Sequence, residues 1–154
     1  MAPRRSAGLL LYRRTSNGVE VLLGHMGGPF FARRDDGGWS IPKGEYDEDE
    51  APLAAARREF TEEFGAPPPA GDYTELGTIA QKNGKQVTAW AVEADLDANA
   101  IVSNTFEIEW PPKSGRRQAF PEVDRADWFD IDTARRKMVG GQAALLDRLV
   151  NAVG

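Results

Sequence analysis

Two short apolar stretches near the start of the chain, "GLLLYRR" and "VEVLLGH", lie on either side of the dipeptide Asn17-Gly18. Both residues of that dipeptide tolerate positive φ, so it favours a tight hairpin turn. Residues 7–25 are therefore predicted to form two antiparallel strands. The pattern returns in residues 72–94, where apolar and β-branched residues flank Asn83-Gly84, and this predicts a second hairpin.

Between the two hairpins lies a segment with helical periodicity. Pro52 suits the first position of a helix, and Gly65, followed closely by three prolines, is a strong stop signal. A helix is therefore predicted over about residues 52–64. Its apolar stripe is formed by Leu53, Phe60 and Phe64, which fall within about 40° of one another at about 100° per residue.

The remaining segments complete a mixed architecture. The stretch 26–40 is rich in glycine and reads as a loop, residues 104–129 as a strand, a long loop and a short strand, and residues 140–153 as a second helix. Hairpins interleaved with helices favour an α/β fold with a mixed sheet between helices over a doubly wound parallel sheet. At 154 residues the chain suits one domain, 1–154.

Composition excludes several classes of protein. The chain has no cysteine, which rules out disulfides, thiolate metal sites and a cysteine nucleophile. Its net charge of -5, from 19 basic and 24 acidic residues, argues against binding to long nucleic acids. No apolar run approaches the length of about 20 residues that spans a bilayer, so we expect a cytoplasmic protein with small-molecule partners.

The predicted helix carries an unusual set of carboxylates. Glu59, Glu62 and Glu63 spread over about 100° of its surface, next to the apolar stripe, where like charges repel one another. Arg58 can pair with Glu62, but one guanidinium cannot neutralise three carboxylates. A hard divalent cation, Mg²⁺ or Mn²⁺, would do so through oxygen ligands. A solvated acidic face of the helix is the alternative.

The segment from Gly44 to Ala66 resembles the Nudix box, the signature of the Nudix hydrolases. Nine specified positions are filled over these 23 residues: Gly44, Glu50, Arg58, Glu59, Phe60, Glu62, Glu63, Gly65 and Ala66. The opening strand, the approach "GGWSIPKG" and the closing "WFDI" extend the likeness over most of the chain. The resemblance implies an α/β/α sandwich with a mixed β-sheet, and hydrolysis of a nucleoside diphosphate linked to some group X.

The resemblance also implies roles for residues of the box. Glu59, Glu62 and Glu63 would bind the metal, together with the carbonyl of Gly44. Divalent metal ions relieve the charge around the attacked phosphorus and lower the pKa of a bound water. Which carboxylate also takes the proton of that water stays open.

Three residues would support these ligands. Arg58 and Glu50 match positions that orient the ligating glutamates, and Arg58 is counted with Glu59 and Glu62 among the catalytic candidates. Glu122 precedes the closing strand, where several family members have a further metal-binding or base glutamate. An exposed loop glutamate is the alternative reading of Glu122.

Substrate contacts are predicted at Trp39, Lys43 and Lys82. The first two lie in "WSIPKG", which resembles the approach sequence of dinucleoside polyphosphate hydrolases and diphosphoinositol polyphosphate hydrolases, and an ammonium there suits phosphate. Trp39 is equally a candidate core residue. His25, the only histidine, is interpreted as incidental rather than catalytic. The segment 106–122, which contains the long loop and its Arg116-Arg117 pair, is expected to border the pocket.

The residues that are typical of individual Nudix subfamilies do not point to one substrate. A tyrosine typical of dinucleoside polyphosphate hydrolases is replaced by Lys82-Asn83-Gly84, and a proline typical of ADP-ribose hydrolases by Ala80. A dinucleoside polyphosphate or a nucleoside triphosphate is the preferred substrate. ADP-ribose, a damaged nucleoside triphosphate, an RNA 5′ end and an inositol pyrophosphate are the alternatives, and a non-catalytic nucleotide sensor is the alternative outside the enzymes. The sequence does not indicate an oligomeric state.

Overall fold

A computed structural model describes residues 5–153 of the chain. Its elements follow the order β1 (Arg5–Thr15), β2 (Gly18–Met26), β3 (Trp39–Ser40), β4 (Lys43–Glu45), α1 (Pro52–Phe64), β5 (Thr74–Ala80), β6 (Gln86–Glu93), η1 (Ala98–Ala100), β7 (Thr105–Glu109), β8 (Arg117–Pro121), β9 (Val123–Asp130), α2 (Ile131–Lys137) and α3 (Ala144–Val153). Both predicted hairpins are present, as β1–β2 and β5–β6, and the predicted helix over residues 52–64 is α1.

The two hairpins join into one mixed sheet. Strands β1 and β6 pair in parallel along eight residues, from Arg5↔Gln86 to Tyr12↔Glu93, and the path through the sheet is β3-β2-β1-β6-β5. Strand β9 pairs with β2, and the short strand β4 pairs with β1, both antiparallel. Strand β1 therefore lies at the centre of the sheet, which explains its continuous apolar run.

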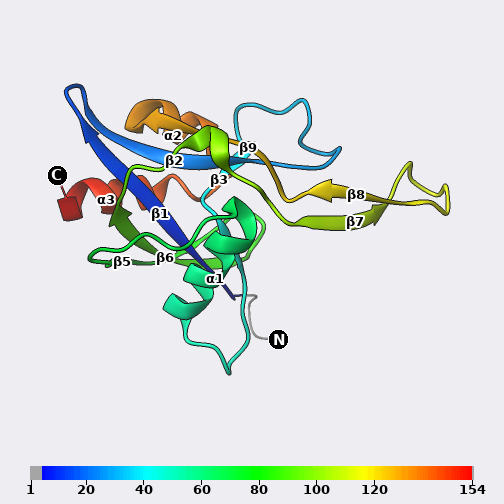
Figure 1. The fold of residues 1–154 in the computed structure, drawn as a ribbon, viewed down its shortest axis with the longest axis horizontal. Coiled ribbons are helices and arrows are strands. Elements are labelled where there is room, and N and C mark those ends of the chain that lie inside the picture. The colour runs from blue at the N-terminus through cyan, green and yellow to red at the C-terminus, as the bar shows by residue number, and fades with distance from the viewer. Residues whose placement is uncertain (1–4, 154) are drawn as a thin grey trace.

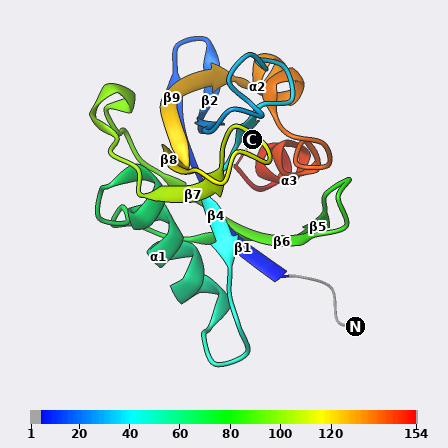
Figure 2. The same cartoon turned by 90° about the vertical axis from the view of Figure 1, so that its right-hand side faces the viewer.

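Helices cover both faces of this sheet, α1 on one side and α2 with α3 on the other (Figures 1 and 2). Successive residues of β1 point to opposite faces. Leu9 and Leu11 pack with Phe60 and Phe64 of α1, whereas Leu10 packs on the α3 side. The architecture is the predicted α/β/α sandwich with a mixed sheet. No helix within residues 5–153 has the length and apolar character needed to cross a membrane.

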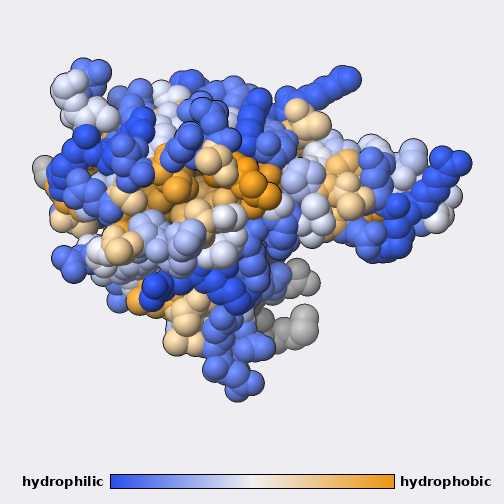
Figure 3. Space-filling model, in the orientation of Figure 1, coloured by the Kyte–Doolittle hydropathy of each residue, from blue (hydrophilic) through white to orange (hydrophobic). Residues whose placement is uncertain are grey.

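Strands β7 and β8 form a separate two-stranded sheet that projects from the main body and ends in a hydrophilic tip (Figures 1 and 3). This corrects the prediction of one long loop before β9, because residues 117–121 are a strand paired with β7 in the register Thr105↔Pro121 to Glu109↔Arg117. Helix α2 was also absent from the prediction. Its N-terminus is capped by the Asp130 side chain, which accepts a hydrogen bond of 2.7 Å from the Thr133 amide.

Candidate active site

Helix α1 fixes the acidic side chains of the candidate site relative to the sheet. Its buried face consists of Ala55, Ala56, Phe60 and Phe64, all at most 1% exposed, packed on β1, β2 and β6. The helix ends where predicted, at Gly65, whose φ of 71° favours glycine. Because this face is anchored, Glu59, at 7% exposure, is held at the edge of the core.

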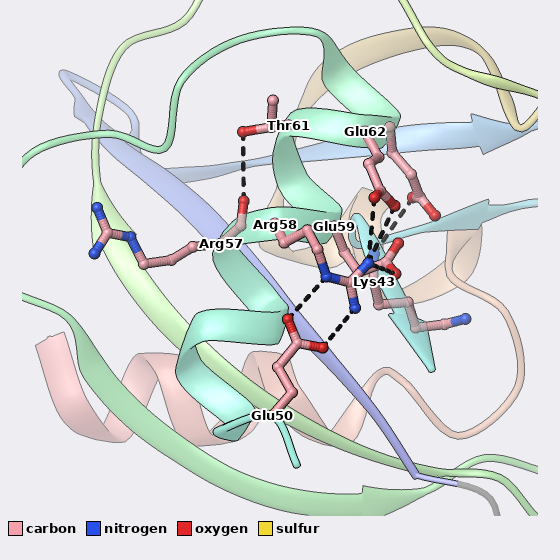
Figure 4. A network of polar contacts seen from close by, with 8 residues as sticks. Lys43, Glu50, Arg57, Arg58, Glu59, Thr61 and Glu62 are labelled. Carbon is pink, nitrogen blue, oxygen red and sulfur yellow. Dashed lines mark hydrogen bonds and ion pairs between the residues drawn. The ribbon is translucent and has the colours of Figure 1, made fainter. Parts of the chain in front are cut away.

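Arg58 ties these carboxylates together (Figure 4). Its Nε and Nη2 donate to the two carboxylate oxygens of Glu50, both at 2.8 Å, in a bidentate pair. Its Nη1 donates to Glu59 at 2.8 Å and to both oxygens of Glu62 at 3.3 Å. The guanidinium thus connects the loop before α1 with two of the predicted metal ligands, as expected for a positioning residue. These carboxylates raise the pKa of Arg58 further above its usual value, Glu50 most of all.

Strand β4 brings the start of the box against the helix. A Cβ atom at Gly44 would lie 2.0 Å from Cδ of Glu59, so only glycine leaves room for this carboxylate. The amide of Lys43 donates a hydrogen bond of 3.3 Å to Glu63. Gly44, Glu59 and Glu63 are therefore in close proximity although 15 or more residues separate Gly44 from the other two.

Burial and mutual repulsion raise the pKa values of two box carboxylates, Glu59 and Glu63. Burial raises the pKa of Glu59, and the charge of Glu62 raises it further against the opposing effect of Arg58. Burial likewise raises the pKa of Glu63 well above its ordinary value, against the opposing charge of Lys43. Glu122 adds to both increases, so this residue from the junction of β8 and β9 lies near the box carboxylates.

A cavity of about 340 Å³ opens beside these carboxylates; we call it the acidic cavity. Glu63 and Glu122 line it with Lys43, Gly44 and Ser40. Its apolar wall comes from the β2–β3 loop and from β7, through Phe30, Phe31 and Phe106. The cavity thus combines acidic oxygens, an ammonium group and aromatic rings, the groups needed to hold a metal-bound phosphate and a flat base.

Two of the three rings in the aromatic wall were not predicted. Phe30 and Phe31 lie in a loop that the sequence marks only by its glycines, whereas Phe106 begins the segment 106–122 that was expected to border the pocket. Phe106 and Glu122, the two ends of that segment, line the cavity, and residues 107–121 extend into the projecting hairpin. Phe30 is 68% exposed and meets Trp110 of the hairpin edge to face, with ring centroids 5.7 Å apart.

The three predicted substrate contacts have different positions. Lys43 lines both the acidic cavity and a second cavity of about 260 Å³, whereas Lys82 lines only the second one. Trp39 is 4% exposed and lines neither cavity. Its indole packs on Phe129 and donates a hydrogen bond of 2.9 Å to Asp35, as the alternative reading of a core residue expects.

His25 has a structural position. It is 2% exposed, and its two ring nitrogens lie 2.8 Å from Asp124 and 2.7 Å from the Arg34 carbonyl. The ring therefore attaches the middle of the β2–β3 loop to strand β2 and to the residues following Val123. It lines neither cavity.

Gln142, which the sequence did not single out, joins the walls of both cavities. Its side chain is fully buried and donates to Ser40 at 2.9 Å and to Gln81 at 2.8 Å, while its oxygen accepts from the Ile41 amide at 3.2 Å. Ser40 lines the acidic cavity and Gln81 the second one. The side-chain amide of Gln142, in the segment before α3, therefore links the wall of one cavity to the wall of the other.

The donor set suits a hard divalent cation, because it consists of carboxylate and backbone oxygens. In residues 5–153 no three acidic or histidine side chains already converge on one point. The Arg58 guanidinium donates to both Glu59 and Glu62, as Figure 4 shows. Burial is the main cause of the raised pKa values of Glu59 and Glu63, with repulsion between the carboxylates adding to it, and a bound cation would oppose both effects.

The fold is a mixed sandwich that presents a glutamate-rich helix beside an open cavity. Comparison with known proteins identifies its family. A model of the NUDIX domain family matches residues 2–149. The chain therefore belongs to the NUDIX domain family and is a Nudix hydrolase. A search among curated proteins found no match.

Solved structures share the fold. The binary complex of an Ap4A hydrolase from C. elegans is similar with a TM-score of 0.68 at 20% identity, covering 96% of this chain and 97% of the other. The NUDIX domain of Shewanella oneidensis NrtR, complexed with ADP ribose, is similar with a TM-score of 0.66 at 16% identity, covering 100% and 90%. A Nudix hydrolase from M. smegmatis, RenU, shares 27% identity at a TM-score of 0.54, covering 99% and 87%.

Proposed function

We propose that this protein is a Mg²⁺-dependent pyrophosphohydrolase that cleaves a phosphoanhydride bond in a nucleoside diphosphate linked to a second group. The observation that carries the proposal is the position of the complete box: its glutamates lie on an anchored helix, beside a cavity that also contains an ammonium and an aromatic wall. Mn²⁺ would serve in place of Mg²⁺, since both favour oxygen ligands.

Glu59, Glu62 and Glu63 would hold the metal, with the Gly44 carbonyl and Glu122. When bound, the metal supplies charge neutralisation at the phosphate oxygens and a more acidic water. Glu59, Glu62 and Glu122 are the candidates to receive the proton of the attacking water. For Glu122, this is supported by its position in the lining of the cavity that Glu63 also lines.

Arg58 would act as a positioning residue, because it fixes two of these carboxylates and the loop before them. Its bidentate pair with Glu50 limits where the guanidinium can move when the metal binds. The ammonium of the half-buried Lys43 would contact a phosphate oxygen of the substrate, since Lys43 lines the same cavity as Glu63 and Glu122.

A dinucleoside polyphosphate or a nucleoside triphosphate is the proposed substrate. The approach sequence around Lys43 supports it, as does the fold shared with an Ap4A hydrolase. The fold shared with an ADP-ribose-bound NUDIX domain makes ADP-ribose the second candidate. A nucleotide sensor that binds without cleaving is the remaining candidate, and the same experiment tests it.

The test is product identification by mass spectrometry. The wild-type protein is incubated with Ap4A, ATP, ADP-ribose, a 5′-triphosphate RNA and an inositol pyrophosphate, with Mg²⁺, with Mn²⁺ and with EDTA. We expect one P–O–P bond of one compound to be cleaved, with oxygen from water on one product. Glu62→Gln should lose this activity while remaining folded, whereas Glu75→Gln, on the exposed edge strand β5, should retain it.

Two results would contradict the proposal. The first is cleavage that persists in EDTA or in Glu62→Gln. The second is recovery of an intact nucleotide in a stable complex with wild-type protein under conditions where none of the five compounds is cleaved, which would identify a sensor.

A further inference from the structure

The second cavity, which we call the basic cavity, is lined by four cationic side chains: Arg34, Lys43, Lys82 and Lys85. None of the described residues that line it is acidic. This local cluster of positive charge contrasts with the net charge of -5 of the whole chain. Cations gathered around one concave site repel one another unless an anion is present between them.

The fold assembles this set from three places. Lys43 comes from β4, Arg34 from the β2–β3 loop, and Lys82 and Lys85 from the β5–β6 turn. Gly140 makes room for the stem of Lys82, since a Cβ atom there would lie 2.6 Å from Lys82 Cδ. The Lys82 amide also donates a hydrogen bond of 3.1 Å to the Gly140 carbonyl, so the turn is fixed against the segment before α3.

These charges have few partners within the protein. Lys85 lies 3.9 Å from Glu45, the outer limit for an ion pair. Among the ion pairs formed by residues 5–153, none involves Arg34, Lys43 or Lys82. Lys43 has the Glu63 carboxylate nearby, as its effect on the pKa of Glu63 indicates, and the Arg34 guanidinium lies 5.4 Å from the centroid of the Phe31 ring. Arg34 and Lys82 therefore remain as cations of the basic cavity that form no ion pair among the described residues.

The basic cavity is continuous with the acidic one. Four residues line both of them: Met26, Phe31, Lys43 and Lys85. Lys43 and Lys85 thus stand at the boundary, with the carboxylates on one side and Lys82 and Arg34 on the other. A single extended ligand can occupy both cavities, with different chemistry at its two ends.

We propose that the basic cavity binds a further phosphate of the substrate, one that lies outside the diphosphate being cleaved. This inference rests on the proposed function for the place of the reaction, and it restricts the substrate class to compounds with three or more phosphates in a chain. Ammonium and guanidinium groups suit phosphate oxygens. The extra phosphate is either internal, as in a dinucleoside polyphosphate, or terminal, as in a nucleoside triphosphate.

Direct binding of inorganic tripolyphosphate tests the cavity without requiring hydrolysis. Isothermal titration calorimetry is carried out in EDTA with wild type, Lys82→Ala, Lys82→Gln and the double variant Arg34→Ala/Lys82→Ala. We expect wild type to bind, and the double variant to bind about tenfold more weakly or worse, since each lost bond to a charged group costs a sizeable share of the affinity. Higher salt should weaken wild-type binding.

Arg57→Ala is the matched control. This arginine lies on the opposite side of α1 from Arg58 and points away from the glutamates (Figure 4). Its removal changes the net charge equally but should leave tripolyphosphate binding within about twofold of wild type. The proposal would be overturned by wild-type protein that does not bind tripolyphosphate at about 1 mM, or by equal weakening in Arg57→Ala and Lys82→Ala.

Kinetics then connects the cavity to the reaction. Lys82→Ala should raise KM for Ap4A or ATP several-fold with little change in kcat, and should leave KM for ADP-ribose unchanged, because ADP-ribose has no third phosphate. A rise in KM for Ap4A would indicate that the cavity binds an internal phosphate, and a rise in KM for ATP that it binds a terminal one. An equal rise in KM for all three would refute the proposal. If no compound is hydrolysed, the proposed function fails, and the calorimetric result still decides the role of the basic cavity.

Discussion

Replacing Gln142 by leucine should destabilise the protein strongly, because this side chain is fully buried and makes three hydrogen bonds. Each buried hydrogen bond contributes about 1 kcal/mol net, and a buried backbone amide left without a partner costs about 1–3 kcal/mol. The Ile41 amide would be such a group. The sum predicts a loss of about 3–5 kcal/mol in the free energy of unfolding.

Urea unfolding followed by circular dichroism measures this loss. Gln118→Leu, on the exposed strand β8, is the matched control and should change stability by no more than about 0.5 kcal/mol. A double-mutant cycle with Gln81→Leu should give a coupling energy of about 1 kcal/mol for the bond between the two amides. A Gln142→Leu protein within about 1 kcal/mol of wild type would refute the reasoning that these bonds hold the walls of the cavities.

Two further predictions concern the box and the start of α2. Gly44→Ala places a methyl group 2.0 Å from the Glu59 carboxyl carbon, so we expect the Glu59 side chain to shift. Mg²⁺-dependent hydrolysis should fall at least tenfold while the unfolding midpoint stays near that of wild type. A comparable loss of activity and of stability would contradict this prediction. The hydrogen bond from the Thr133 amide lowers the pKa of Asp130 in the folded protein. The capping contribution of Asp130 is therefore present above the unfolded pKa of 3.8 and is lost as the pH falls through the lower folded pKa. The stability of Asp130→Asn should depend less on pH between about pH 5 and 2 than that of wild type, and parallel stability curves would exclude the effect.

Local signals account for what the sequence predicted well. Each hairpin turn contains an Asn-Gly pair, and α1 has Pro52 at its start and Gly65 at its end, so backbone preferences alone determine these boundaries. The box glutamates were found for a similar reason, because their spacing on one helix is a local property. Strand β8 was missed since its sequence, RQAFP, has no alternation of buried and exposed positions and is stabilised by pairing with β7.

Contacts between distant segments explain the rest of the site. Gln142 reaches residues that precede it by 61 and 102 positions, and no pattern near it indicates a buried amide. The basic cavity likewise depends on the β5–β6 turn meeting the segment around Gly140, a proximity that only the folded sheet creates. Lys82 was predicted as a phosphate contact, but its separation from the acidic cavity was not.

The β2–β3 loop contributes to both cavities, through Phe30 and Phe31 on one side and Arg34 on the other, and His25 holds the Arg34 carbonyl from within the core. The acidic helix, by contrast, belongs to the sandwich and shares no residue with this loop. If the proposed function holds, substitutions in the middle of the loop would change substrate preference while leaving the glutamates of α1 in place. Recognition and chemistry would then be able to evolve separately, without rebuilding the fold.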